Sequence, residues 1–478
     1  MGDASHPYLE ILERRTARRR ETAQHHLAPH DGAPAAVVDA LERAVDAQEG
    51  ELTAILHDLH EHPETAFREH HAADVVVGHL ASHGIAAQRP AHGLDTAVRA
   101  EVRSQDFDPT RDRTVGILAE YDALPEIGHG CGHNVIAVAG LGAFTALADL
   151  LRAEPRAFRG RVVFLGTPAE EGQAGKELMA RHGAFDDLDA AVMVHSYFTD
   201  TADQAWLGRR DCRVRFTGRA AHASSHPFLG RNALDAASLA YQGIGLLRQQ
   251  TPPTDRIHAV ITEGGSQPNI ITESAQMLLY VRSQDPETLA ELSARVDQVL
   301  RGAAMMAGVE AQVRWDEAPA TLPVRSNGPL TDRWVLAQRR RGRDPYPGGT
   351  VSEVLAASTD FGNVSHRVPG IHPLIRVSAD GVGLHTREFA AAAGTPDAER
   401  AGMDGAFGLA CAALDFLHDD ALAAAVREVA ALPDPVGRVL AALCPAPWAG
   451  TDEACLRSTW RARSCITWRA RSCPAWRA

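Results

Sequence analysis

TVGILAEYDALPEIGHGCGHNVIAVAGLGAFTALADLLRA, residues 114–153, is the stretch that decides the fold. Its apolar start is typical of a buried strand, and the apolar segment from residue 133 onward is typical of a buried helix. Two further apolar segments, RVVFLG at 161–166 and AAVMV at 190–194, alternate with helical segments in the same way. Apolar strands with helices between them indicate an α/β domain with a mixed, largely parallel sheet.

A second domain interrupts this pattern. From residue 209 the order of elements becomes β-α-β-β-α-β, and the first of these strands, CRVRFTG at 212–218, alternates polar and apolar residues. That order is typical of a ferredoxin-like α+β unit, so we expect it to be inserted into the α/β domain. The predicted organisation is an N-terminal arm (1–37), the α/β domain in two parts (38–208 and 327–443), the inserted domain (209–326) and a low-complexity tail rich in Cys, Trp and Arg (444–478).

Composition limits the function classes. The 478 residues carry a formal net charge of −13, which argues against a nucleic-acid-binding protein because such proteins need a basic surface. We find no uninterrupted apolar run of membrane-spanning length and no secretory signal, so we expect no membrane association. Seven cysteines in so long a chain do not form a disulfide framework, which predicts a reducing, cytoplasmic location.

The loop GHGCGHN at 128–134 places Cys131 and His133 one residue apart, after the strand that ends before Glu120. Thiolate and imidazole are ligands that zinc-like metals prefer, and a glycine-flanked loop allows both to face one ion. The alternative is a glycine turn with one buried cysteine and a histidine that caps a helix. The loop by itself does not decide between the two.

Two more features lie beyond strand ends. Glu170 and Glu171 follow RVVFLGTPA, where one carboxylate could bind a metal and the other could act as a general base. Taken alone they are better explained as solvated acids in the first turn of a helix. His195 closes an apolar strand, and such a histidine is more often a satisfied core residue. All three features, however, follow the carboxyl ends of strands of one predicted sheet, where α/β folds place ligands. Their combination predicts a metal centre.

At this point the chain resembles a known family. The motifs EYDALPEIGHGCGHNVIA (120–137), GTPAEEGQAGK (166–176), GRAAHASSHPFLGRNALDA (218–236), EGGSQPNIITE (263–273) and GLHTREFA (383–390) occur in the order typical of the aminoacylase and carboxypeptidase G-type di-metal peptidases. Within that family the chain is similar to the amidohydrolase branch in which cysteine replaces a bridging aspartate. The first motif is most similar to Xaa-Arg (β-alanyl-lysine) dipeptidases and aminobenzoyl-glutamate hydrolases. The resemblance covers roughly residues 38–432.

The resemblance implies two divalent metal ions per chain, zinc or manganese, and hydrolysis of an amide bond through a metal-bridging water. Glu120 stands where the wider family has a ligand histidine, so we do not expect it to bind metal. The implied roles are a bridging ligand for Cys131, further metal ligands for His133, Glu171, His195 and His385, the general base for Glu170, and orientation of a ligand imidazole for Asp122.

The inserted domain is implied to be a lid that forms a homodimer. His222 is similar to the histidine that reaches a neighbouring subunit's site and stabilises an oxyanion, and Asn269 to a substrate-binding amide. From the sequence alone, His222 reads as an exposed residue at a strand end. Arg282 is a weaker candidate for the substrate carboxylate, because it could equally lie on a solvated strand face.

The expected substrate is a small molecule, a dipeptide or an N-acyl amino acid. Aminobenzoyl-glutamate or another N-acyl amino acid is the alternative. A substrate with a cationic side chain would need an acid in its pocket, and Asp360 is a speculative candidate whose other explanation is a structural turn. A non-catalytic binding protein on the same scaffold would be expected to lack ligands or the base, and this chain has them all.

Overall fold

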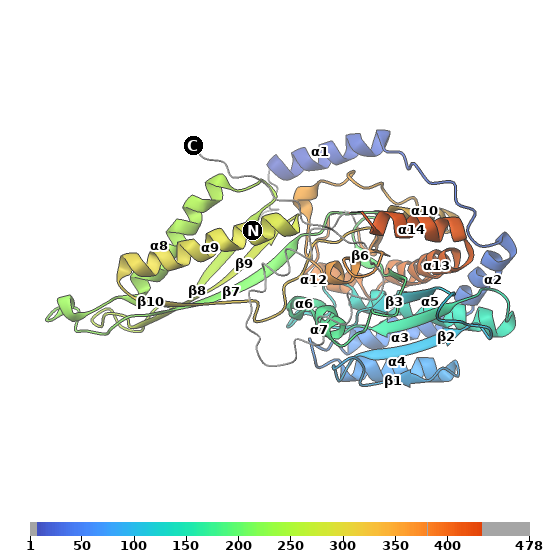
Figure 1. Ribbon diagram of the computed structural model, residues 1–478, viewed down its shortest axis with the longest axis horizontal. Helices are drawn as coiled ribbons and strands as arrows, with labels where there is room; N and C mark the ends of the chain where they lie inside the picture. The colour runs from blue at the N-terminus through green and yellow to red at the C-terminus, as the bar shows by residue number, and fades with distance from the viewer. Residues whose placement is uncertain (1–6, 380, 433–478) are drawn as a thin grey trace, which may run out of the picture.

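The computed structural model describes residues 7–379 and 381–432. Figure 1 shows a layered α/β domain and, on the left, an elongated domain that projects from it. The predicted fold class is therefore confirmed: a mixed α/β domain with an inserted α+β domain. The predicted tail at 444–478 lies outside the described residues.

The central sheet of the α/β domain has six strands in the order β1-β2-β4-β3-β5-β11. The pairs β4–β3, β3–β5 and β5–β11 are parallel, while β1–β2 and β2–β4 are antiparallel. A short parallel pair, β6–β12, follows β5 and β11 along the chain. The strand bounds are β1 Ala87–Gln88, β2 Val98–Arg103, β3 Thr114–Ala119, β4 Arg161–Gly166, β5 Ala190–Val192, β6 His195–Tyr197, β11 Gly370–Ile371 and β12 Leu374–Arg376.

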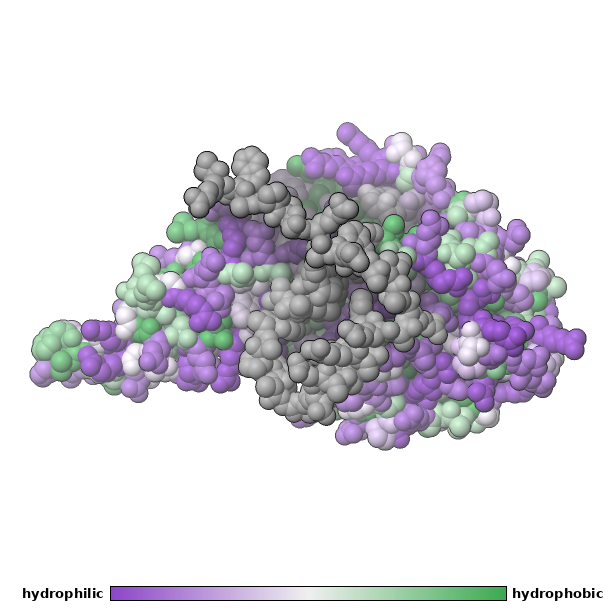
Figure 2. All heavy atoms as spheres, in the orientation of Figure 1, coloured by the Kyte–Doolittle hydropathy of each residue, from purple (hydrophilic) through white to green (hydrophobic). Residues whose placement is uncertain are grey.

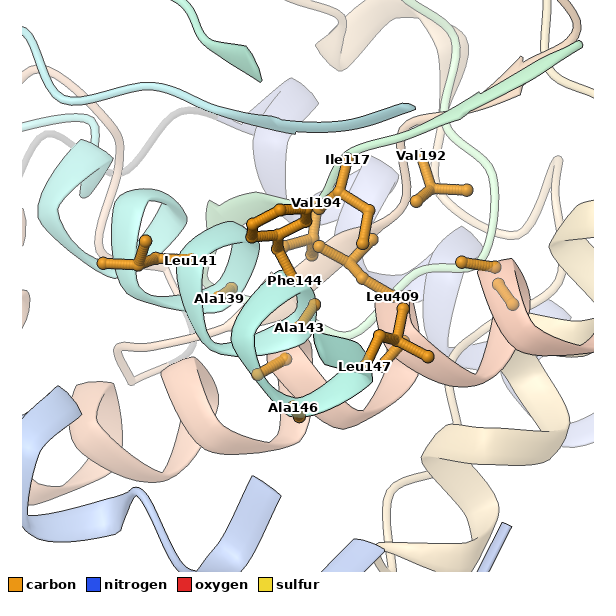
Figure 3. Close-up of a cluster of buried hydrophobic side chains, with 14 of the residues drawn as sticks. Ile117, Ala139, Leu141, Ala143, Phe144, Ala146, Leu147, Val192, Val194 and Leu409 are labelled. Atoms are coloured by element: carbon orange, nitrogen blue, oxygen red, sulfur yellow. The ribbon is translucent and has the colours of Figure 1, made fainter. Parts of the chain in front are cut away.

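Helix α5 (His133–Ala153) is the centre of the hydrophobic core. Figure 3 shows Phe144 and Leu147 of α5 gathered with Ile117 of β3 and Leu409 of α13 (Pro396–His418). By length and composition α5 could cross a membrane, but 89% of its most apolar window is buried in this domain. Burial against the sheet explains its apolar sequence, because each fully buried large side chain contributes about 1.5–3 kcal/mol.

The remaining helices surround the sheet or connect its strands (Figure 1). They are α1 Pro7–Thr22, α2 Ala35–Asp46, α3 Glu49–Glu61, α4 His70–Ser82, α6 Glu170–Gln173, α7 Gly175–Arg181, α10 Gly328–Arg340, α11 Phe361–Ser365, α12 Arg387–Ala392 and α14 Asp420–Ala430. Helices α2 and α3 both pack on α5. Short 3-10 turns lie at Pro227–Leu229, Arg248–Gln250 and Glu353–Leu355.

The inserted domain, which we call the lid, has the predicted β-α-β-β-α-β order. Its four antiparallel strands are arranged β10-β7-β9-β8, and α8 and α9 bury their apolar faces against them. The bounds are β7 Gly208–Thr217, α8 Ala233–Leu247, β8 Arg256–Glu263, β9 Ser274–Ser283, α9 Pro286–Ala307 and β10 Glu310–Trp315. Strand β8 lies at the edge of this sheet.

Two helix boundaries differ from those that periodicity suggests. The helical pattern from residue 38 to 64 is two helices, because the chain turns at Gln48, whose buried amide bonds Ala44 O and the Thr145 hydroxyl. The pattern hides this break because the apolar positions on both sides face α5. The next helix, expected from residue 65, begins only at His70. The preceding residues leave the helical conformation because the Glu69 carboxylate accepts the Phe67 N–H.

Candidate metal centre

The loop between β3 and α5 sets the position of Cys131 and His133. Gly132 has a φ of 70° and lies directly before the first residue of α5. A side chain at this position would also collide with Ser196, since a Cβ would lie 2.7 Å from the Ser196 Cβ. Glycine therefore lets the chain enter α5 in a left-handed conformation and pass close to β6. Both neighbours of Gly132, Cys131 and His133, are buried.

His133 is held by carboxylates on both sides of its ring. Its Nδ1 lies 3.1 Å from Oδ1 of Asp122, as the sequence predicted for an orienting acid. Because that carboxylate accepts the Nδ1 proton, Nε2 is left with a free lone pair. Nε2 lies 3.5 Å from Glu120 Oε2 and 4.0 Å from Glu171 Oε1. Nε2 therefore faces the side of the site where the other candidate ligands gather.

Cys131 lies between two further imidazoles. Its Sγ is 3.7 Å from Nε2 of His195 and 3.5 Å from Nε2 of His385. His195 donates its Nδ1 proton to the Ser196 carbonyl at 2.7 Å, so its Nε2 is also unprotonated. Two ligands of one tetrahedral zinc, with Zn–S about 2.3 Å and Zn–N about 2.1 Å, lie about 3.6 Å apart. The observed separations match that value.

The glutamates complete the cluster. Glu171 Oε1 lies 3.6 Å from His385 Nε2, and the Glu171 N–H donates to Oδ2 of Asp122 at 2.9 Å. Asp122 thus positions both His133 and the segment that carries the two glutamates. Glu170 is buried beside Glu171 and falls in one group with it and His133.

The donor set fits a dinuclear metal site. The ligand atoms of Cys131, His133 and His195 form one close group, and those of Cys131, Glu171 and His385 form another. Cys131 belongs to both, so its sulfur is placed where it could be shared. Within the described residues, His133 Nε2 and Glu171 Oε1 are buried without a hydrogen-bond partner. A bound cation would supply the missing partner for these atoms.

Charge crowding shifts the pKa values of this cluster. Burial, followed by the charges of Glu120 and Glu171, raises the pKa of Glu170 well above its ordinary value. Burial and then Glu171 raise the pKa of the Cys131 thiol. Burial and then His133 lower the pKa of His195 to about 3, so its imidazole is neutral. Cations at these ligands would offset the repulsion and favour thiolate and carboxylate forms.

The lid residues predicted from the resemblance divide into two places. His222 and Ile270 form a bridge, and Asn269 O accepts the Ala223 N–H, so His222 and Asn269 lie side by side. They lie beyond the far end of β7, whose ten residues span about 30 Å. His222 is partly exposed. The structure therefore does not bring His222 and Asn269 to the cluster of their own chain.

Arg282 lies at the other end of the lid, next to the α/β domain. It pairs in register with Arg209, whose guanidinium donates to the Gly172 carbonyl at 3.1 Å. Gly172 directly follows Glu171. Arg282 Nε is buried without a hydrogen-bond partner among the described residues, and burial, then Arg209, lowers the Arg282 pKa. Arg282 is therefore near the cluster and is not a solvated surface residue.

The suggestion that Asp360 accepts a cationic substrate side chain is wrong. Asp360 is fully buried, and its two oxygens accept from the backbone N–H of Lys176 at 2.9 Å and from Lys176 Nζ at 2.7 Å. Lys176 Nζ also contacts Glu120. The charge of Asp360 is already used inside the protein, so it is unavailable to a ligand.

Sequence reasoning missed two residues beside the cluster. The Glu69 carboxylate accepts the Ala169 N–H at 2.9 Å and the Thr96 hydroxyl at 2.9 Å, which fixes the turn before Glu170. His372 is buried with its ring centroid 5.5 Å from that of His195. A glutamate at a helix start and a histidine in a short strand connection gave no signal. Only His385, also in a loop, was found, and the family resemblance supplied it.

Comparisons with known proteins agree with this geometry. Residues 116–393 match the model of peptidase family M20/M25/M40. The chain is 36% identical over 396 residues to the Xaa-Arg dipeptidase of Homo sapiens, covering 80% of this chain and 89% of that protein. It is 29% identical over 451 residues to one of the two p-aminobenzoyl-glutamate hydrolase chains of Escherichia coli, covering 80% and 92%. The crystal structure of a dinuclear metal-binding M20 peptidase from Bacillus subtilis has the same fold, with a TM-score of 0.58, 21% identity and coverage of 78% and 99%.

An α/β domain with clustered thiol, imidazole and carboxylate ligands, and an inserted four-stranded lid, defines a metallo-hydrolase of the peptidase class. The chain belongs to peptidase family M20/M25/M40 and is a hydrolase of that family. This assignment excludes the non-catalytic scaffold that was the alternative from another class.

Proposed function

We propose that this protein is a di-metal dipeptidase that hydrolyses the amide bond of dipeptides of the Xaa-Arg or Xaa-Lys type. The observation that carries the proposal is the convergence of five metal-ligating side chains around Cys131, with Glu170 buried beside them. The similarity to Xaa-Arg dipeptidases of Homo sapiens and Mus musculus, at 36% and 34% identity, supports the substrate class.

The metal ligands would be Cys131, His133, Glu171, His195 and His385, with Cys131 shared. When bound, two divalent cations lower the pKa of a water molecule and polarise the scissile carbonyl. Zinc suits the thiolate and imidazoles, and manganese suits the carboxylate, so zinc and manganese are both candidates. Asp122 would keep His133 in the required tautomer and so support metal affinity.

Glu170 would act as the general base. It would accept a proton from the attacking water and deliver it to the leaving amine as the C–N bond breaks. Its position supports this role: it is buried next to a ligand glutamate, and Glu69 fixes the turn that precedes it through the Ala169 N–H. The released products would be a free carboxylic acid and a free amine.

A substrate with a free carboxylate suits Arg282. Its buried Nε has no partner within the described residues, and it lies beside Arg209 at the junction of lid and α/β domain. The pair of guanidinium groups favours an anionic group there. Aminobenzoyl-glutamate also carries carboxylates, and the similarity to the Escherichia coli hydrolase keeps it as the second candidate substrate.

We propose that the lid forms a homodimer in which His222 reaches the partner's site. Figure 2 shows apolar residues on the surface of the lid. Tyr241 and Leu246 of α8 and Val260 of edge strand β8 are 46%, 64% and 52% exposed. An apolar helix face beside an unpaired strand edge suits a two-fold interface. The distance of His222 from its own cluster also supports a role in the partner.

A cytoplasmic location is part of the same proposal. The three cysteines among the described residues, Cys131, Cys212 and Cys411, are free and buried. A reducing compartment would keep the Cys131 thiolate available to metal, whereas an oxidising one would expose it to disulfide exchange. Fractionation of cells that express the full chain would test this location.

The first experiment measures metal content by elemental analysis of the freshly purified protein. We expect about two zinc or manganese ions per chain, retained in Glu170→Gln but reduced in Cys131→Ser. Cys411→Ser is the matched control, because it replaces a buried thiol of α13 away from the ligands. Absence of stoichiometric metal, even after supplementation, would refute the proposal.

The second experiment compares substrates on the metal-loaded protein. We expect dipeptides with a carboxyl-terminal arginine or lysine, including β-alanyl and γ-aminobutyryl dipeptides, to be hydrolysed faster than N-acyl amino acids or aminobenzoyl-glutamate. Glu170→Gln should lower kcat by about 10²–10⁴-fold with every substrate. Preference for aminobenzoyl-glutamate would transfer the proposal to the second candidate.

A further inference from the structure

A second group of metal-ligating side chains lies away from the candidate metal centre. Glu51 comes from the first turn of α3, His79 from the last turn of α4, and His83 directly follows α4. One ligand atom from each lies within 4.8 Å of the other two. Glu51 Oε2 is 3.5 Å from His83 Nε2 and 3.7 Å from His79 Nδ1. The carboxylate therefore faces a nitrogen of both imidazoles.

The spacing of the histidines explains why they converge. Residues four apart lie on the same helix face, so His79 and His83 form a stacked pair at the end of α4. Their ring centroids are 4.6 Å apart. Two ligands of one ion, each about 2.1 Å from it in tetrahedral geometry, lie about 3.4 Å apart. The separations of 3.5 and 3.7 Å between Glu51 and the rings are longer than good hydrogen bonds but suit two ligands of one ion.

The group has the outer support that is typical of metal-binding histidines. Nδ1 of His83 lies 2.9 Å from Oδ2 of Asp149 on α5. Because Asp149 accepts that proton, His83 Nε2 keeps its lone pair directed at Glu51. Arg152 holds Asp149 in turn and also donates to the His83 carbonyl. The ring of His83 is thus fixed in orientation and tautomer.

His79 is the unsatisfied member of the group. It is 7% exposed, and its Nε2 is buried without a hydrogen-bond partner among the described residues. If that nitrogen carries the proton, Nδ1 keeps its lone pair on the side of Glu51. Burial and then the neighbouring His83 lower the pKa of His79 to about 4, so the ring is neutral at pH 7. Glu51 is exposed at 63% of its side chain, which leaves a path from solvent.

The group is separate from the candidate metal centre. His133 begins α5 and Asp149 lies sixteen residues further along the same helix, about 24 Å away at about 1.5 Å per residue. In Figure 1, α3 and α4 lie at the lower right of the α/β domain, away from the lid. An ion at Glu51 would therefore join α3 to α4 and would not contact substrate.

We propose that Glu51, His79 and His83 form a further binding site for a zinc-like divalent transition metal, with Asp149 orienting His83. Two neutral imidazoles and one carboxylate favour zinc, nickel, copper or cobalt over magnesium or calcium, which prefer oxygen ligands. Three protein ligands leave one position for water. The ion would clamp two helices of the domain and add stability.

The test titrates zinc into protein that already holds its active-site metals, by calorimetry and by elemental analysis after gel filtration. We expect one additional zinc per chain, and at least tenfold weaker binding in Glu51→Gln/His83→Gln. Asp58→Asn/His71→Gln is the matched control, because it removes another carboxylate–imidazole pair, 2.8 Å apart, on the neighbouring helix ends. That control should bind zinc like the parent.

Thermal unfolding supplies a second readout. Zinc should raise the Tm of the parent and of the control variant but leave the Tm of Glu51→Gln/His83→Gln unchanged. Anomalous scattering at the zinc edge should show a peak between α3 and α4. Equal zinc affinity in the two double variants, or no additional zinc at millimolar concentration, would overturn the proposal. Activity and active-site metal content should be unchanged in Glu51→Gln/His83→Gln, so this result is separate from the proposed function.

Discussion

Lys176 Nζ lies 2.7 Å from Oδ1 of Asp360 and also contacts Glu120, and the side chains of all three residues are fully buried. Lys176 is the only lysine in the chain. Burial lowers the Lys176 pKa, but Asp360 and Glu120 outweigh it, so the net pKa is raised and the lysine stays charged. Its charge balances carboxylates that would otherwise be unpaired behind the ligand cluster.

Lys176→Met should therefore destabilise the protein strongly. Removing one partner of a buried ion pair leaves uncompensated charge, at a cost of about 3–5 kcal/mol. Urea unfolding of the variant should show a midpoint well below that of the parent. Lys176→Met/Asp360→Asn should recover part of the loss because it removes one of the stranded charges. An unchanged midpoint in Lys176→Met would contradict this account.

Asp122→Asn should weaken metal binding while the fold is kept. Asp122 orients both His133 and the Glu171 backbone, and loss of such an outer partner typically costs about 10–100-fold in metal affinity. Competition with a chelator would measure the change. Asp112→Asn is a suitable control, because Asp112 pairs with the half-exposed Arg159 away from the cluster. Equal affinity in both variants would show that Asp122 has no such role.

The buried Glu69 should make stability depend on pH. Burial and then Asp122 raise its pKa from 4.5 to about 7. Between these pH values the folded state holds a proton that the unfolded state has released, so this group's contribution is fully present below about pH 4.5 and is lost as pH rises through about 7. The change is on the order of 3 kcal/mol.

Glu69→Gln should flatten that dependence, because glutamine does not titrate. Urea unfolding at pH 5, 6, 7 and 8 would compare the slopes of parent and variant. The variant keeps an oxygen that can accept the Ala169 N–H, so it should remain folded. Parallel curves for the two proteins would mean that Glu69 titrates in its ordinary range.

Subunit mixing tests the proposed action of His222 in the partner. Glu170→Gln and His222→Ala should each be nearly inactive alone. A random mixture should recover about a quarter of the parent's sites, because each heterodimer has one site with intact Glu170 and the partner's intact His222. The mixture would be dissociated, recombined and assayed. No recovery despite verified exchange would place His222 outside the partner's site.

The sequence was sufficient for the fold class and for most of the ligand cluster. Cys131, Glu171 and His195 each follow an apolar strand, and carboxyl ends of parallel strands meet at one edge of a sheet. Strand order along the chain therefore predicts that these side chains converge. His385 did not follow from this rule. It lies in a loop that is placed by the His385 N–H donating to the Gly130 carbonyl at 2.8 Å, and the resemblance to the family was needed to find it.

Only the tertiary structure decided which polar residues serve the fold. Asp360 was a candidate for binding substrate, yet it is separated by 184 residues from Lys176, the partner that uses its charge. Glu69 reaches Ala169 across 100 residues, and Glu51 meets His83 only because α3 and α4 pack together. Local periodicity reports which face of an element is apolar. It carries no information about which distant side chain satisfies a buried charge, because that pairing depends on how the elements pack in three dimensions.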